Sequence, residues 1–211
     1  MKKYLWILAA AFLLQACSKD EEEGPYVPWR PEDQKEETID LDKATNVMIL
    51  PEQAKNRIVM IDQPTGKVAW EWKAADSGLS ATEQAWFNTP DEAKPVYNRT
   101  CVLVTASGGG VAIIRIADKK VMFYASAGNN PHSAEVFPDG NLVVASTDND
   151  GFLSTFRVDT VARTGQVVQK LPLTFCHSAV WDRSRGRLLA TSDNKLCVFT
   201  YNGCLLYTSD A

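Results

Sequence analysis

The chain has 211 residues, of which 45% are hydrophobic and 23% are charged. Its 26 acidic and 22 basic residues give a formal net charge of −4, which lacks the basic footprint of a nucleic-acid-binding protein, so we expect no nucleic acid among its partners. Beyond the N-terminal region no stretch approaches the run of about 20 apolar residues that a membrane-spanning helix needs.

The N-terminus carries the features of an export signal: a positive start, an apolar run over residues 4–14, and a small residue before a cysteine. The segment Leu14–Cys17 resembles the lipobox of bacterial lipoproteins, in which the chain is cleaved before the cysteine and the thiol is diacylated. We therefore predict a signal peptide over residues 1–16 and attachment to a membrane through lipids on Cys17. An ordinary signal peptide that ends near a cysteine is the alternative.

An acidic and proline-containing stretch follows the lipobox, and we predict a disordered tether over residues 17–44. The acidic run Asp20–Glu23 resembles the surface-export signal of Bacteroidota lipoproteins. That resemblance implies an outer-membrane lipoprotein that faces the cell surface. A solvated spacer without a sorting role is the alternative.

Four cysteines besides Cys17 are spread through the chain with no Cys-x-x-Cys pair, namely Cys101, Cys176, Cys197 and Cys204. We expect them to be free and buried. The exported location leaves a disulfide open as the alternative.

The remaining chain consists of short β-type runs separated by Gly, Pro, Asn and Asp, which predicts an all-β class. A His-Ser-Ala start recurs at His132 and His177, 45 residues apart. The apolar strand marked by Val102, Leu142 and Leu188 recurs at steps of 40 and 46 residues. A propeller blade occupies about 40–45 residues, so the repeat predicts a partial β-propeller over residues 45–211.

Each blade is expected to have four strands, which we name a to d from the axis outward. The predicted strands are b, c and d at 46–50, 57–61 and 67–72; b, c and d at 100–106, 111–116 and 120–125, with strand a within 82–98; a to d at 132–137, 141–146, 152–158 and 166–171; and a to c at 177–181, 187–191 and 195–201. The first blade has no strand a, and no later segment supplies one. Because propellers have about 4–8 blades, we expect about four blades here and a chain truncated at its C-terminus.

The last residues, 203–211, allow two interpretations. The run from Cys204 resembles translated adapter sequence at the end of an assembled gene, which would make it a non-native tail. The alternative is a native strand d after the Asn202-Gly203 turn.

Two motifs resemble known propeller repeats. The run Asp62–Trp70 resembles the tryptophan-docking repeat of quinoprotein-type propellers, which implies a c–d turn at Thr65-Gly66, a Trp70 that packs on a neighbouring blade, and no quinone cofactor. The His-Ser-Ala run at His132 resembles blade starts of NHL-type propellers. The whole arrangement resembles an uncharacterised family of Bacteroidota lipoprotein propellers.

The loops that join strands d to a and b to c lie on one face of a propeller, and we expect the candidate ligand-binding residues to meet there. These residues are His132, His177, Asn130, Asp148, Asp150 and Asp193. The flexible loop 107–110 joins the same face, and the position equivalent to the histidines in the preceding blade is expected near Thr82 and Glu83. The alternative is that Asn, Asp and Gly are only what such turns require.

We therefore predict a binding module for a glycan or another small polar ligand, and assign no catalytic residue, metal or cofactor. Whether the protein is an enzyme stays open, with a binding module favoured. The resemblance to NHL-type and oligogalacturonate lyases implies a metal-dependent polysaccharide lyase or hydrolase that uses His132 and His177 as the alternative. An assembly scaffold at the outer membrane, with an envelope protein as partner, is the third possibility.

Overall fold

The computed structural model describes residues 35–128, 130–147 and 150–208. Within these ranges the chain forms one compact unit that begins at Glu36. The predicted signal peptide, Cys17 and the tether up to residue 34 lie outside the described residues, as does Asp148. None of the helices in the described ranges is long and apolar enough to cross a membrane.

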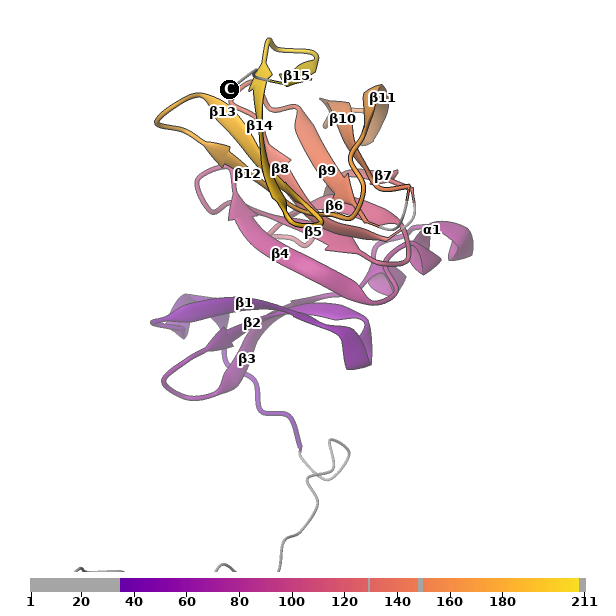
Figure 1. Ribbon diagram of the computed structural model, residues 1–211. Helices are drawn as coiled ribbons and strands as arrows, with labels where there is room; N and C mark the ends of the chain where they lie inside the picture. Colours follow the sequence, from indigo (N-terminus) through magenta and orange to yellow (C-terminus); the bar gives the residue numbers. More distant parts are fainter. Residues whose placement is uncertain (1–34, 129, 148–149, 209–211) are drawn as a thin grey trace, which may run out of the picture. The chain divides into compact units, whose positions relative to one another are not determined.

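The strands form four antiparallel sheets that follow one another along the chain, as the indigo-to-yellow colouring of Figure 1 shows. The sheets are β1 (Val47–Glu52), β2 (Arg57–Asp62) and β3 (Lys67–Trp72); β4 (Pro90–Val96), β5 (Cys101–Ala106), β6 (Gly110–Arg115) and β7 (Val121–Ser126); β8 (Pro131–Val136), β9 (Leu142–Ser146), β10 (Phe152–Asp159) and β11 (Thr164–Pro172); and β12 (Cys176–Asp182), β13 (Arg187–Ser192), β14 (Lys195–Tyr201) and β15 (Leu206–Thr208). Each sheet is a meander in which strands adjacent in sequence pair with each other. The predicted all-β propeller class is confirmed.

Helical structure in the described residues is limited to short segments. Single 3-10 turns cover Leu41–Lys43, Gln53–Lys55 and Ala74–Asp76. The helix α1 (Ala81–Ala85) begins with a capping box, in which Ser80 and Glu83 bond to each other's backbone N–H groups. This helix precedes β4, which lies inside the range predicted to hold the second blade's strand a.

The first sheet has three strands, and its β1 takes the second position of a blade. β1 and β2 both contact β4, just as β5 and β6, the second and third strands of the next sheet, both contact β8. The strand that would occupy the innermost position of this sheet is therefore missing from the described residues, as the sequence predicted.

Successive sheets pack face to face, so that β5, the second strand of its sheet, is buried on both sides. All six residues of β5 are buried. Val102 and Val104 join the core shared with the first sheet, whereas Leu103 joins the core shared with the third sheet. Side chains alternate between the two faces of a strand, and both faces are covered, which explains why the strand reads as one apolar run.

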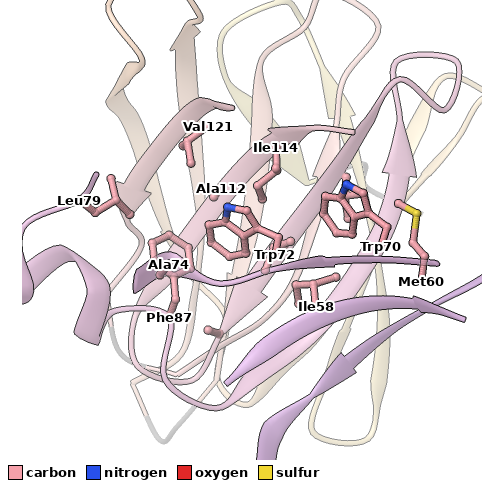
Figure 2. Packing of buried hydrophobic residues seen from close by; sticks show 13 residues of the cluster. Ile58, Met60, Trp70, Trp72, Ala74, Leu79, Phe87, Ala112, Ile114 and Val121 are labelled. Carbon is pink, nitrogen blue, oxygen red and sulfur yellow. The ribbon is translucent and has the colours of Figure 1, made fainter. Parts of the chain in front are cut away.

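The first and second sheets are joined by two tryptophans of β3 (Figure 2). The Trp70 Nε1–H donates to the Ile116 carbonyl at 2.9 Å, and Trp72 packs edge-on against Phe87 at 5.4 Å between ring centroids. The preceding turn depends on Gly66, whose φ of 69° is left-handed. The predicted docking of Trp70 on a neighbouring blade is confirmed.

The segment before β1 pairs with the outer strand of the first sheet. The Ile39 N–H donates to the Val68 carbonyl at 3.0 Å, in a parallel bridge. Arg57, whose side chain is 4% exposed, bonds to Glu36, and this hydrogen bond lowers the pKa of Glu36 to about 2. The compact unit therefore begins at Glu36 rather than at the predicted boundary, Thr45.

The last described strand completes the fourth sheet. β15 pairs with β14, and Leu206 is 2% exposed. The Gln169 side chain both donates to the Leu206 carbonyl and accepts from its N–H, at 3.0 and 2.7 Å. The four cysteines in the described ranges are free, and burial raises the pKa of the Cys176 thiol to about 12.

Candidate functional site

The innermost strand of each four-stranded sheet begins with a β-bulge at the same position. The pairing register shifts between Pro90 and Glu92, between Pro131 and Ser133, and between Cys176 and Ser178. The extra residue in the three bulges is Asp91, His132 and His177. A bulge re-aims a side chain away from the regular sheet pattern, and such irregularities are common next to functional sites.

A repeated backbone arrangement holds the three bulges in one geometry. The residue two positions before each bulged residue has a left-handed backbone conformation. Its carbonyl accepts a hydrogen bond from the N–H of the residue that follows strand b. The left-handed residues are Thr89, Asn130 and Phe175, with φ of 55°, 50° and 50°. The donors are Ser107, Thr147 and Asp193, at 2.9, 3.0 and 3.4 Å. The d–a and b–c loops of each blade therefore meet at one end, as the topology predicted.

His132 and His177 come from neighbouring blades and stack on each other. Their ring centroids are 5.0 Å apart and the rings are inclined by 22°. The His177 Nδ1 lies 2.9 Å from the Phe175 carbonyl and 3.2 Å from Thr147 Oγ1. Because a carbonyl only accepts hydrogen bonds, Nδ1 of His177 carries a proton, and in the neutral ring Nε2 is left as an acceptor.

Asp91 lies next to His132 in the preceding blade, so that Asp91, His132 and His177 form a row across three blades. Its Oδ1 lies 3.8 Å from His132 Nδ1, and its side chain is 10% exposed. Ser107 Oγ donates to the same carboxylate at 2.5 Å, and Gln53 Nε2 donates to it at 3.3 Å. These donors fix the carboxylate beside the histidine pair.

The inner strands are also tied to each other directly below the row. The Glu92 carboxylate accepts from Ser133 Oγ at 3.1 Å and pairs with Lys94 at 3.0 Å. Ser133 Oγ in turn accepts from the Ala179 N–H at 3.2 Å. These bonds cross two blade boundaries, so they fix the three inner strands relative to one another next to the bulged residues.

The other predicted site residues take different places. The Asn130 carbonyl shapes its bulge, as described above. Asp193 is exposed in the turn between β13 and β14, with a φ of 42°, and its N–H bonds to Phe175. Asp150 is exposed in the loop before β10. In the described ranges neither of these two aspartate side chains bonds to a histidine.

The sequence interpretation missed Asp91 and placed its equivalent near Thr82 and Glu83, which is wrong. Those residues belong to α1, where Glu83 serves the helix cap. The signal that finds Asp91 is the Pro-x-x-Ala pattern of Pro90–Ala93, which matches Pro131–Ala134.

The glycine loop 107–110 is packed rather than open. The Gly110 N–H donates to the Trp86 carbonyl at 2.8 Å, and a Cβ added at Gly108 would lie 2.5 Å from the Ala85 carbonyl oxygen. The glycines therefore permit close approach to the end of α1.

The described residues hold no group of three or more His, Cys, Asp and Glu side chains placed to bind a metal ion. A zinc site needs at least three protein ligands. What the row offers is two adjacent imidazoles and one oriented carboxylate, which together can donate to and accept from a polar ligand.

Solved structures share the architecture at low sequence identity. A functionally unknown protein from Desulfotomaculum acetoxidans matches 79% of this chain with a TM-score of 0.59 and 12% identity. The WD40 β-propeller domain of Doa1 matches 79% with a TM-score of 0.54 and 14% identity, and the dihydro-heme d1 dehydrogenase NirN matches 84% with 0.56 and 14%. The chain spans 51%, 50% and 37% of these three structures, so it matches about half or less of their length.

No curated protein matches the chain. A family model described as "Family of unknown function (DUF6528)" matches residues 1–206. The chain belongs to the DUF6528 family.

Proposed function

We propose that this protein is a binding module for a small polar ligand, such as a glycan, held at the mouth formed by Asp91, His132 and His177. The observation that carries the proposal is the shared bulge, which brings one polar side chain from each of three successive blades to one row. A propeller fold alone does not specify a ligand, and it is this row of side chains that supports the binding role.

The chemistry of the row suits hydroxyl groups. In the neutral ring the His177 Nε2 is an acceptor with no partner among the described residues, and the Asp91 carboxylate accepts through both oxygens. A sugar carries several hydroxyl groups, so one hydroxyl can donate to the imidazole and another to the carboxylate. Because the backbone below the row is already fixed, ligand binding would cost little free energy for ordering the protein.

We also propose that the module is held at the outer membrane, facing the cell surface, by lipids on Cys17. The lipobox Leu14–Cys17 and the acidic run Asp20–Glu23 support this. An envelope glycan or protein would then be within reach of the mouth.

The test begins with the full chain without residues 1–16 and with Cys17→Ser, screened against an oligosaccharide array. Calorimetry on the bound sugar should then show that His132→Ala, His177→Ala and Asp91→Asn each weaken binding about tenfold or more, as expected when a buried or charged partner is lost. The matched control is Val161→Ala, a side chain that is 93% exposed in the turn between β10 and β11.

Two results would assign a different function. Tight stoichiometric metal in the purified protein that disappears in His132→Ala would assign a metal-dependent enzyme instead. Co-purification of an envelope protein from membranes, with normal sugar binding in all three variants, would assign a scaffold.

A further inference from the structure

The other end of the same inner strands carries a cavity of about 620 Å³, within the size range of small-molecule sites. It is formed by the turns that follow β4, β8 and β12. We propose that this cavity binds a neutral sugar ring, at a site separate from the histidine-bearing mouth. The proposal does not depend on the function proposed above.

Aromatic rings form one wall of the cavity. Tyr97 and Trp181 line it, and Trp181 is held in place by the buried Phe137, edge-on at 5.4 Å between centroids. Phe137 is itself stacked on Tyr201 at 3.8 Å. A flat aromatic surface with a polar tip suits the C–H face of a pyranose, whose rim carries hydroxyl groups.

Both donors and acceptors face a ligand here. Within the described residues neither the Trp181 indole N–H nor the Arg183 guanidinium has a hydrogen-bond partner, so both remain available as donors. Asp139 and Glu135 supply acceptors, and Asp139 is held by the Tyr201 hydroxyl at 2.8 Å. Only a group that donates and accepts, such as a hydroxyl, satisfies both kinds.

The charged groups also set the charge of the ligand. Glu135 pairs with Lys94 at 3.7 Å, so the charges that face a ligand are the Asp139 carboxylate and the Arg183 guanidinium, which offset each other. A neutral sugar needs no counter-charge here and can still bond to these groups.

The turn at the cavity edge is backbone-strained. Tyr97, Asn98 and Arg99 have φ of 50°, 54° and 65°, although none of them is glycine. Such strained backbone is concentrated at functional sites. The strained turn presents Tyr97, whose hydroxyl donates to the Gly140 carbonyl at 3.3 Å across the cavity edge.

The two ends can be tested separately because the inner strands hold them apart. A strand of six residues spans about 20 Å. A substitution at Arg183 therefore leaves the histidine row untouched, and a substitution at His177 leaves the cavity untouched.

The experiment is saturation-transfer NMR on the full chain with four neutral disaccharides, maltose, cellobiose, lactose and xylobiose, and with digalacturonate as the acidic probe. We expect saturable transfer to at least one neutral disaccharide and weaker binding of digalacturonate. Arg183→Ala should weaken that binding about tenfold, as loss of a charged hydrogen-bond donor does, and Val161→Ala, an exposed position that does not line the cavity, should leave it unchanged. Arg183 is exposed, so this variant is expected to fold, and Trp181→Phe gives a second test that keeps the ring and removes the N–H.

Several outcomes would overturn the proposal: no transfer to any of the four neutral sugars, tighter binding of digalacturonate, or binding that survives both Arg183→Ala and Trp181→Phe. Binding lost in His177→Ala but kept in Arg183→Ala would overturn it as well, and would place the sugar at the histidine-bearing mouth.

Discussion

Asp91, His132 and His177 occupy one backbone position in three blades but differ in what holds them. His177 is bonded to the Phe175 carbonyl at 2.9 Å, so it orders its own loop as well as facing the mouth. His132 lies 3.8 Å from Asp91, beyond hydrogen-bond distance, and its side chain is 29% exposed. The two histidines therefore combine structural and ligand-facing roles to different degrees.

The first prediction follows from this difference. His177→Ala removes the donor to the Phe175 carbonyl and should lower the free energy of unfolding by about 1 kcal/mol. Among the described residues His132→Ala removes no hydrogen bond of this kind, so it should cost less. Urea unfolding of both variants measures this, and equal losses would contradict the assignment.

A second prediction concerns Trp70. Trp70→Phe keeps an aromatic ring in the core but leaves the Ile116 carbonyl without its 2.9 Å donor, so we expect a loss of about 1–3 kcal/mol in stability. Val161→Ala, at an exposed turn, should change stability by less than about 0.5 kcal/mol. Thermal unfolding followed by circular dichroism compares the two, and a Trp70→Phe variant as stable as the control would show that the docking bond is unimportant.

At the scale of elements, the strand pattern could be predicted because each blade contributes apolar runs separated by turn residues. The runs 195–201 and 67–72 were predicted at the bounds of β14 and β3. Strand periodicity did not predict the bulges, since a single extra residue disturbs the alternation only locally. Asp91 was missed for this reason, together with the short helix α1 that interrupts the spacing before β4.

The segment that pairs with β3 leads to a pH prediction. The hydrogen bond from Arg57 lowers the pKa of Glu36 from 4.5 to about 2. A carboxyl group with a lowered pKa contributes stability that is complete above its unfolded pKa and is lost as the pH falls through the folded value. Stability should therefore fall between about pH 4.5 and pH 2, and partial exposure of Glu36 to solvent limits the size of the effect.

Glu36→Gln tests this contribution. The variant should be less stable than the wild type at pH 7, and the gap should close as the pH approaches 2. Glu37→Gln is the neighbouring control, because Glu37 pairs with the exposed Lys67 instead of Arg57. A gap that stays constant from pH 7 to pH 2 would show that the Glu36 charge is not involved.

At the scale of the whole molecule, blade repetition made the fold predictable, and the topology rule for loops placed both histidines at one end. The contact between them depends on the packing of β8 against β12, which no local pattern encodes. The cavity at the opposite end went unpredicted because its turns, at Pro138 and Arg183, have the composition of ordinary connections.

Membrane attachment gives a prediction for the intact protein. Cys17→Ser should move the protein from the detergent phase to the aqueous phase in phase partitioning, because the proposed acyl chains provide the anchor. Cys204→Ser is the matched control and should partition like the wild type. A Cys17→Ser protein that stays in the detergent phase would contradict lipid attachment at this residue.

Two blades bring their bulged histidines, His132 and His177, together at one mouth. The chain contains two histidines, so selective labelling of histidine gives two sets of imidazole signals in the NMR spectrum. Because the ring centroids of His132 and His177 are 5.0 Å apart, we predict nuclear Overhauser cross-peaks between the two rings. Two rings that show no mutual cross-peak in the folded protein would contradict the account.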